Sequence, residues 1–129
     1  MTGLSWILRK FTMNPENLFG EADTVAGCGS IEHDLVDMCV ETEKCRHLLN
    51  KVAWLYDRND AESKKYSSVV KLAIPESAIK ALNRSIDILG GYGYMRDQGL
   101  EGALRDVRIT SIYEGTSKIQ KNAISKILY

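Results

Sequence analysis

The segment "IYEGTSKIQ" near the C-terminus contains one carboxylate, Glu114, just ahead of a stretch that predicts a helix. A structural role would suffice, because the partial positive charge of a helix N-terminus favours a carboxylate by roughly 0.3–1 kcal/mol. A chemical role is also open, since the same backbone amides can bind an oxyanion or a polarised carbonyl oxygen. A carboxylate beside such a site could remove a proton from a substrate. From the residues alone, Glu114 is either a catalytic base or an acidic residue that opens the last helix.

A second candidate is the glycine-rich stretch "GGYGY", which runs from Gly90 to Tyr94. It does not match the GxGxxG pattern of dinucleotide-binding turns, and no predicted strand precedes it. The residues alone favour a helix end followed by a turn, with Tyr92 and Tyr94 packed beneath it.

Metal and nucleophile chemistry find little support in the sequence. Four potential metal ligands lie on one predicted helix, namely His33, Cys39, Cys45 and His47. Ligands on one face of a helix should be three or four residues apart, and these four are not. No segment resembles the GxSxG motif of serine hydrolases. We therefore expect no metal site and no serine triad.

The first helix that positions these residues is predicted from about Ile31, with Ser30 as its N-cap. Apolar side chains recur at alternating spacings of three and four residues, and the stripe comprises Ile31, Leu35, Met38, Thr42, Cys45, Leu49, Val52 and Tyr56. This pattern is typical of a helix that packs nearly antiparallel to its neighbours. Trp54 and Tyr56 are expected in the core.

Three further helices are predicted along the chain. Residues 61–89 form the second, with Asp60 as its N-cap, a kink or break near Pro75, and the glycines after residue 89 as its end. A short helix over 100–107 and a last one over 117–128 follow. In "SKIQ", Ser117 and Gln120 have the form of a capping box.

No segment shows the alternation of a strand, so we predict an all-α fold that resembles an up-and-down four-helix bundle, whose first helix could be incomplete. Residues 1–30 are expected to form a loop-rich arm with a short helix. Residues 31–129 are expected to form the helical bundle.

Length and charge restrict the number of domains and the kinds of partner that the chain can have. A chain of 129 residues allows one core, and its 17 basic and 17 acidic residues balance. We therefore expect no nucleic-acid partner and no membrane partner. The odd count of three cysteines without CxxC spacing argues against a disulfide framework, and we expect a soluble, cytoplasmic protein.

Three motifs in fixed order carry a family resemblance: "ILGGYGY", "RDVRIT" and "IYEGTS". Over about residues 34–129, the chain closely resembles the C-terminal helical domain of the FAD-dependent acyl-CoA dehydrogenases. The resemblance implies an acyl-CoA substrate, FAD and an electron-transfer acceptor, with either a homo-oligomer or the missing dehydrogenase domains as the protein partner. It makes Glu114 the base that removes the α-proton, as in the branch similar to short-chain and medium-chain dehydrogenases.

The resemblance also implies roles for neighbouring residues. Tyr113 would form a wall beside the thioester, and Gly115 would let the backbone approach it. Flavin contacts would come from Thr116, Lys118, Gly90 and Gly91. The two glycines would lie near the ADP portion, often across a subunit interface, and Lys118 stands where the family usually has glutamine or glutamate.

Two possible functions follow, one enzymatic and one non-catalytic. The chain resembles the C-terminal portion of a dehydrogenase without the family's N-terminal helical domain and middle β-domain, so we expect it to be inactive alone. The alternative is a non-catalytic helical module for interaction or oligomerisation. Glu114 at a helix start facing a groove would favour the first function.

Overall fold

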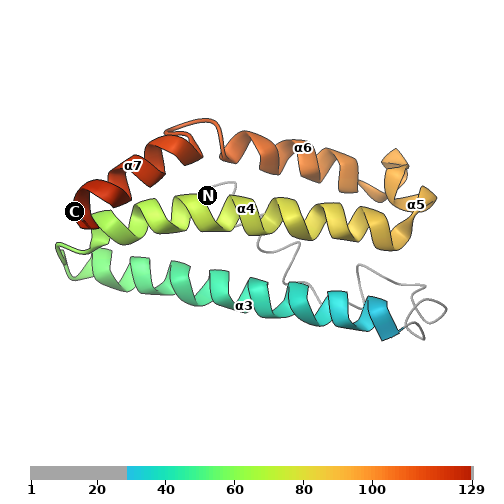
Figure 1. Cartoon of the computed structure of the whole chain (residues 1–129), viewed down its shortest axis with the longest axis horizontal. Coiled ribbons are helices and arrows are strands. Elements are labelled where there is room, and N and C mark those ends of the chain that lie inside the picture. The colour runs from blue at the N-terminus through green and yellow to red at the C-terminus, as the bar shows by residue number, and fades with distance from the viewer. Residues whose placement is uncertain (1–28, 129) are drawn as a thin grey trace. The chain divides into compact units, whose positions relative to one another are not determined.

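The structure is a computed structural model that describes residues 29–128, and every regular element in this range is a helix (Figure 1). The elements are α3 (Gly29–Asp57), α4 (Ser63–Leu89), α5 (Gly91–Tyr94), the 3₁₀ helix η2 (Arg96–Gln98), α6 (Leu100–Thr110) and α7 (Ser117–Leu128). The predicted all-α, bundle-like class is confirmed. The short helix and nearly all of the arm expected over residues 1–30 lie outside the described residues. The boundary predicted after residue 30 stays a prediction.

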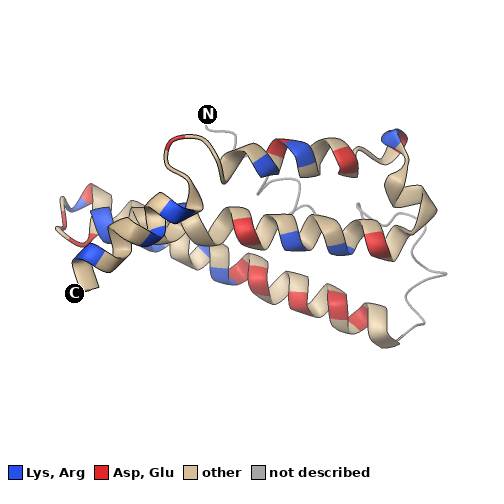
Figure 2. Ribbon diagram, turned by 45° about the horizontal axis from the view of Figure 1, so that its top comes forward, with Lys and Arg blue, Asp and Glu red and all other residues tan. Residues whose placement is uncertain are grey.

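The chain divides into two compact units after Thr42, within α3. In the first unit, α3 carries four acidic residues and no lysine or arginine from residue 29 to 42, as Figure 2 shows. Negative charge is favourable in the first turn of a helix, where Glu32 lies. Ser30 is already helical, so its prediction as the N-cap is wrong.

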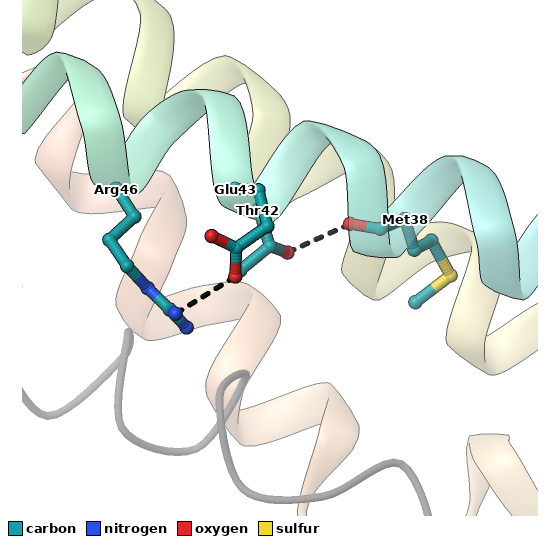
Figure 3. Close-up of polar contacts among 4 residues, drawn as sticks. All are labelled: Met38, Thr42, Glu43 and Arg46. Atoms are coloured by element: carbon teal, nitrogen blue, oxygen red, sulfur yellow. Dashed lines mark hydrogen bonds and ion pairs between the residues drawn. The ribbon is translucent and has the colours of Figure 1, made fainter.

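Short-range polar contacts continue along α3 on both sides of this division (Figure 3). The Thr42 hydroxyl donates a hydrogen bond of 2.8 Å to the carbonyl of Met38, one turn earlier. Arg46 and Glu43 form an ion pair at 2.8 Å, with both side chains nearly half exposed. Such an exposed pair stabilises a helix by only a few tenths of a kcal/mol.

In the second unit, α4 is the central element, and α5, α6 and α7 each pack against it (Figure 1). Its buried positions include Val70, Ile74 and Leu82. Val107 of α6 is 1% exposed and belongs to the same core. Burying a side chain of this size contributes about 1.5–3 kcal/mol. This core fixes α6 and α7, and thereby the turn between them.

Helix α4 passes through Pro75 without a break, so the predicted interruption does not divide the helix. Pro75 and the preceding Ile74 are both buried. A proline removes one backbone hydrogen bond and is costly in an isolated helix. Tertiary packing of this segment offsets the lost bond, which helix propensity alone does not foresee.

The turn between α3 and α4 contains Asn59 at a positive φ of 51°. The carboxylate of Asp60 accepts a hydrogen bond of 2.9 Å from the amide of Glu62. Glu62, rather than the predicted Asp60, is the N-cap residue, because the helix begins two residues later than expected. Across the turn, the Lys51 ammonium lies 3.7 Å from the ring centroid of Tyr66.

The predicted core is wrong mainly at its aromatic residues, which are exposed. Trp54 and Tyr56 are 56% and 73% exposed, while Leu55 is 3% exposed. After Val52, the next inward position can be three or four residues further on, and α3 takes the shorter step. Tyr92 and Tyr94 are also exposed, at 70% and 83%, so the packing predicted for them is wrong.

The segment "GGYGY" forms the short helix α5 rather than only a turn. Gly90 ends α4 with a positive φ of 54°, as its glycine predicts. Gly93 is buried against α4, where an added Cβ would lie 2.7 Å from the carbonyl oxygen of Ile86. This close approach of two backbones requires a glycine. None of the helices that the structure describes is both long and apolar enough to cross a lipid bilayer.

Candidate functional site

The candidate site is the turn that joins α6 to α7, residues 111–116. Helix α6 extends to Thr110, three residues beyond its predicted end. The hydroxyl of Thr110 donates to the carbonyl of Val107 at 2.6 Å, and that of Ser111 donates to the carbonyl of Arg108 at 2.8 Å. Short hydroxyl side chains of this kind satisfy the last carbonyls of a helix and help to end it.

Backbone hydrogen bonds close the turn upon itself. The amide of Tyr113 donates to the carbonyl of Ile109 at 3.1 Å, which continues α6 by one bond. The amide of Ser117 donates back to the carbonyl of Ser111 at 3.3 Å. The ends of the turn are thus tied together, and the intervening residues must reverse the chain within a few positions.

This reversal places Glu114 and Gly115 at positive φ angles of 51° and 102°. For glycine the conformation is ordinary. For a glutamate it is uncommon and costs of order 1 kcal/mol, because the Cβ approaches the following carbonyl. A cost of this kind at a single residue motivates a functional hypothesis.

The N-cap of α7 is Thr116 rather than the predicted Ser117. The Thr116 hydroxyl accepts from the amide of Ile119 at 3.4 Å, and its carbonyl accepts from the amide of Gln120 at 3.0 Å. Ser117 is the first helical residue. The Gln120 side chain does reach back, but it donates to the carbonyl of Gly115 at 3.4 Å. The capping pattern is therefore displaced by one residue.

The Glu114 carboxylate is exposed and has no hydrogen-bond or ion-pair partner within residues 29–128. Because Thr116 caps α7, the helix does not depend on the glutamate to begin. Glu114 still precedes α7 closely enough to benefit from its partial positive charge. Of the two roles left open by the sequence, the role as helix opener does not account for the backbone cost at this residue.

Gly115 has a packing reason to be glycine besides its backbone conformation. A Cβ at this position would lie 2.6 Å from Nε2 of Gln120, well inside contact distance. The bare backbone here is what allows the Gln120 side chain to reach the Gly115 carbonyl.

Tyr113 is 42% exposed, and its ring faces the central helix. The Lys71 ammonium of α4 lies 4.2 Å from the ring centroid. Sequence reasoning missed Lys71, although it is the one charged residue in the apolar run "VVKLAIP", and that isolation was an available signal. Three exposed apolar side chains belong to the turn and the adjoining helix ends, Ile109, Ile112 and Ile119.

The residues expected to contact the flavin fall into two groups. Thr116 and Lys118 are exposed at the start of α7, two and four residues after Glu114. Gly90 and Gly91 lie beyond the far end of α4, 19 residues past the Lys71 contact. At 1.5 Å per residue, this corresponds to about 28 Å along the helix. The structure brings together the turn and the start of α7 and leaves the glycine pair apart.

The charged motif "RDVRIT" supports α6 itself. Arg105 forms an ion pair with Glu101 at 2.6 Å, one turn earlier on the same helix. Its side chain is 74% exposed, so the pair contributes little to stability.

Comparisons with known proteins agree with one another. The family model for the acyl-CoA dehydrogenase C-terminal domain matches residues 21–129. The chain is 40% identical over 104 residues to an acyl-CoA dehydrogenase of Bacillus subtilis (strain 168), covering 81% of the chain and 27% of that protein. It is 39% identical over 102 residues to an acryloyl-CoA reductase (NADH) of Anaerotignum propionicum, covering 79% and 26%.

Among solved structures, the FAD complex of PigA matches with a TM-score of 0.80 and 25% identity. The match covers 98% of the chain and 33% of that structure's chain. The chain spans about a quarter of the length of the curated relatives it matches.

Proposed function

Because the chain belongs to the acyl-CoA dehydrogenase family through its C-terminal domain, we propose that it supplies the catalytic base of a flavin-dependent acyl-CoA dehydrogenase. The reaction is the α,β-dehydrogenation of an acyl-CoA thioester, and Glu114 accepts the α-proton. One observation carries this proposal: an exposed carboxylate, without a hydrogen-bond or ion-pair partner in the part of the chain that the structure describes, is held at a positive φ beside the start of α7.

The chemistry requires a base and a means of stabilising charge on the thioester oxygen. The α-proton of a thioester is weakly acidic, so negative charge must be accommodated on the carbonyl oxygen as the proton leaves. The start of α7 provides partial positive charge beside Glu114. Tyr113 would form one wall of the thioester site, and Gly115 offers bare backbone there. FAD, when bound, supplies the acceptor for the hydride that leaves the β-carbon.

Apolar side chains near Glu114 suit an acyl group. Ile109, Ile112 and Ile119 are each more than half exposed. Covering them with an acyl chain would remove apolar area from water and exclude water from the carboxylate. A carboxylate in a drier site is a stronger base, which the reaction needs.

The exposed polar groups at the start of α7 fit a flavin. The Thr116 hydroxyl and the Lys118 ammonium would hold it, and Lys118 would act as a donor where the family usually has an amide or carboxylate. At Gly90 and Gly91, an added Cβ would meet nothing within 4 Å, so a ligand can approach the backbone closely.

About 28 Å along α4 separates Thr116 and Lys118 from Gly90 and Gly91. This separation decides which subunit's cofactor each group contacts. We propose that Gly90 and Gly91 contact the cofactor of a second subunit, so that the enzyme is a homo-oligomer. The electron acceptor is a separate electron-transfer protein. The absence of nucleic-acid and membrane partners and the cytoplasmic location stay predictions.

The 129 residues by themselves are proposed to have no dehydrogenase activity, because Glu114 and the three isoleucines are exposed to water. The alternative function, a non-catalytic helical module for interaction or oligomerisation, is favoured by the same exposed apolar side chains. Sedimentation separates the two: a monomer that binds no partner contradicts the interaction module.

The test is Glu114→Gln in the flavin-loaded assembly that contains this chain, assayed with an acyl-CoA and an artificial electron acceptor. Loss of a general base should lower the rate by about 10²–10⁴-fold. Glu101→Gln is the matched control, because it removes a carboxylate from α6 that pairs with Arg105 instead. An unchanged rate in Glu114→Gln would exclude the glutamate as the base.

A further inference from the structure

Lys71 of α4 contacts the candidate site without belonging to the turn. Its ammonium group lies 4.2 Å from the ring centroid of Tyr113, the residue before Glu114. Lys71 is only partly exposed, and the residues around it in the chain are apolar. A lysine so placed gives the ring an electrostatic partner on the helix that forms the core of this unit.

We propose that Lys71 is a positioning residue that holds the Tyr113 ring and thereby fixes the Glu114 carboxylate for proton abstraction. This inference rests on the proposed function of Glu114 and deepens it. Lys71 acts through Tyr113 and does not itself touch the reacting atoms.

The hydrogen bonds of this turn, within the described residues, run to α6 and α7. On one side, the amide of Ser117 bonds to the carbonyl of Ser111 at 3.3 Å. On the other, Gln120 bonds to the carbonyl of Gly115 at 3.4 Å, which is a long hydrogen bond. Neither bond connects the turn to α4. The contact between Lys71 and Tyr113 makes that connection.

Positioning matters at this residue because Glu114 occupies a backbone conformation that glutamate disfavours. If the ring is released, the turn can relax toward other conformations. Since proton abstraction requires hydrogen-bond distance, a displacement of about 1 Å can cost up to about 100-fold in rate.

The chain contains a matched pair for comparison. At the turn between α3 and α4, the Lys51 ammonium lies 3.7 Å from the ring centroid of Tyr66. This contact also joins a lysine to a tyrosine across a turn, but it is remote in sequence from Glu114. Removing it tests the general effect of losing such a contact.

The experiment compares kcat and KM of the flavin-loaded assembly carrying Lys71→Met, Lys71→Arg or Lys51→Met. Lys71→Met should lower kcat by about ten-fold and change KM by less than about two-fold. Lys71→Arg should restore kcat to within about two-fold, because a guanidinium also binds the face of an aromatic ring. Lys51→Met should leave kcat unchanged. Wild-type kcat in Lys71→Met, or no recovery in Lys71→Arg, would overturn the proposal.

Tyr113→Leu guards against a simple folding defect in Lys71→Met. If Lys71 acts through the ring, adding Lys71→Met to Tyr113→Leu should lower kcat no further than Tyr113→Leu alone does, whereas multiplied effects would contradict the proposal. Glu114→Gln, assayed in parallel, separates the two hypotheses. If it is inactive while Lys71→Met is fully active, only the positioning role fails. If Glu114→Gln is fully active, the proposed function fails.

Discussion

Two turns of this chain reach the same positive φ angle with different residues. Between α3 and α4, Asn59 has a φ of 51°, and between α6 and α7, Glu114 also has a φ of 51°. Asparagine is among the few non-glycine residues that adopt this conformation readily, and glutamate is not. The first turn thus uses a residue suited to its backbone. The second retains an unsuited one, which is understandable if its carboxylate is needed for chemistry.

The two turns are otherwise built from similar contacts. Each has a lysine above a tyrosine ring. Each also has a side chain that accepts a hydrogen bond from a backbone amide at the start of the next helix. The bond accepted by Asp60 measures 2.9 Å, whereas the bond accepted by Thr116 measures 3.4 Å. The turn with the costly residue therefore also has the longer hydrogen bond between a side chain and an amide. If Glu114 has the proposed catalytic role, stability and function compete at the turn between α6 and α7.

The largest stability effect is expected from Gly115→Ala. The alanine would have to adopt a φ of 102° and would bring its Cβ to 2.6 Å from Gln120. We expect a loss of about 2 kcal/mol in the free energy of unfolding, measured by urea denaturation of the full chain. Gly102→Ala is the control. It lies inside α6 with open space around it, so it should stabilise by about 0.5–1 kcal/mol. Equal changes in the free energy of unfolding for Gly115→Ala and Gly102→Ala would refute this description of the turn.

A reciprocal exchange tests the comparison itself. Glu114→Asn should raise the free energy of unfolding by about 1 kcal/mol, because asparagine tolerates the positive φ. Asn59→Glu should lower it by about the same amount, since the φ at this position is equal. Both are read from denaturation midpoints of the full chain. If Glu114→Asn were destabilising, the glutamate would be contributing to the fold, and the contrast between the turns would disappear.

Two further effects should come from Asp60 and Thr116, whose side chains accept amide hydrogen bonds beside α4 and α7. Asp60→Ala is expected to cost about 1 kcal/mol, and Thr116→Ala about 0.5 kcal/mol, following the lengths of their hydrogen bonds. Thermal unfolding followed by circular dichroism measures both. A larger loss for Thr116→Ala than for Asp60→Ala would show that the hydrogen bond accepted by Thr116 is the stronger of the two.

The sequence predicted the helices well because their apolar periodicity is strong, as at Val70, Ile74 and Leu82. It failed where local rules compete with packing. Propensity predicted a kink or break near Pro75, and α4 contains no break there. Periodicity alone could not choose between Leu55 and Tyr56 as the inward residue, because a step of three or four residues satisfies it equally.

For the candidate site, the sequence supplied Glu114 and its neighbours as a contiguous motif. It could not supply the contact with Lys71, because this residue precedes Tyr113 by 42 positions and only the fold brings them together. The positive φ of Glu114 was equally hidden, since no sequence rule predicts a glutamate there. The separation of Gly90 and Gly91 from the turn likewise follows from the length of α4.

The central claim is that Glu114 removes the α-proton of an acyl-CoA. The most direct measurement is the rate at which the flavin-loaded assembly exchanges the α-protons of an acyl-CoA with deuterium from the solvent, followed by mass spectrometry. The rate in Glu114→Gln is predicted to fall by about 10²–10⁴-fold relative to the unaltered protein. Exchange at the unaltered rate in Glu114→Gln would contradict the claim.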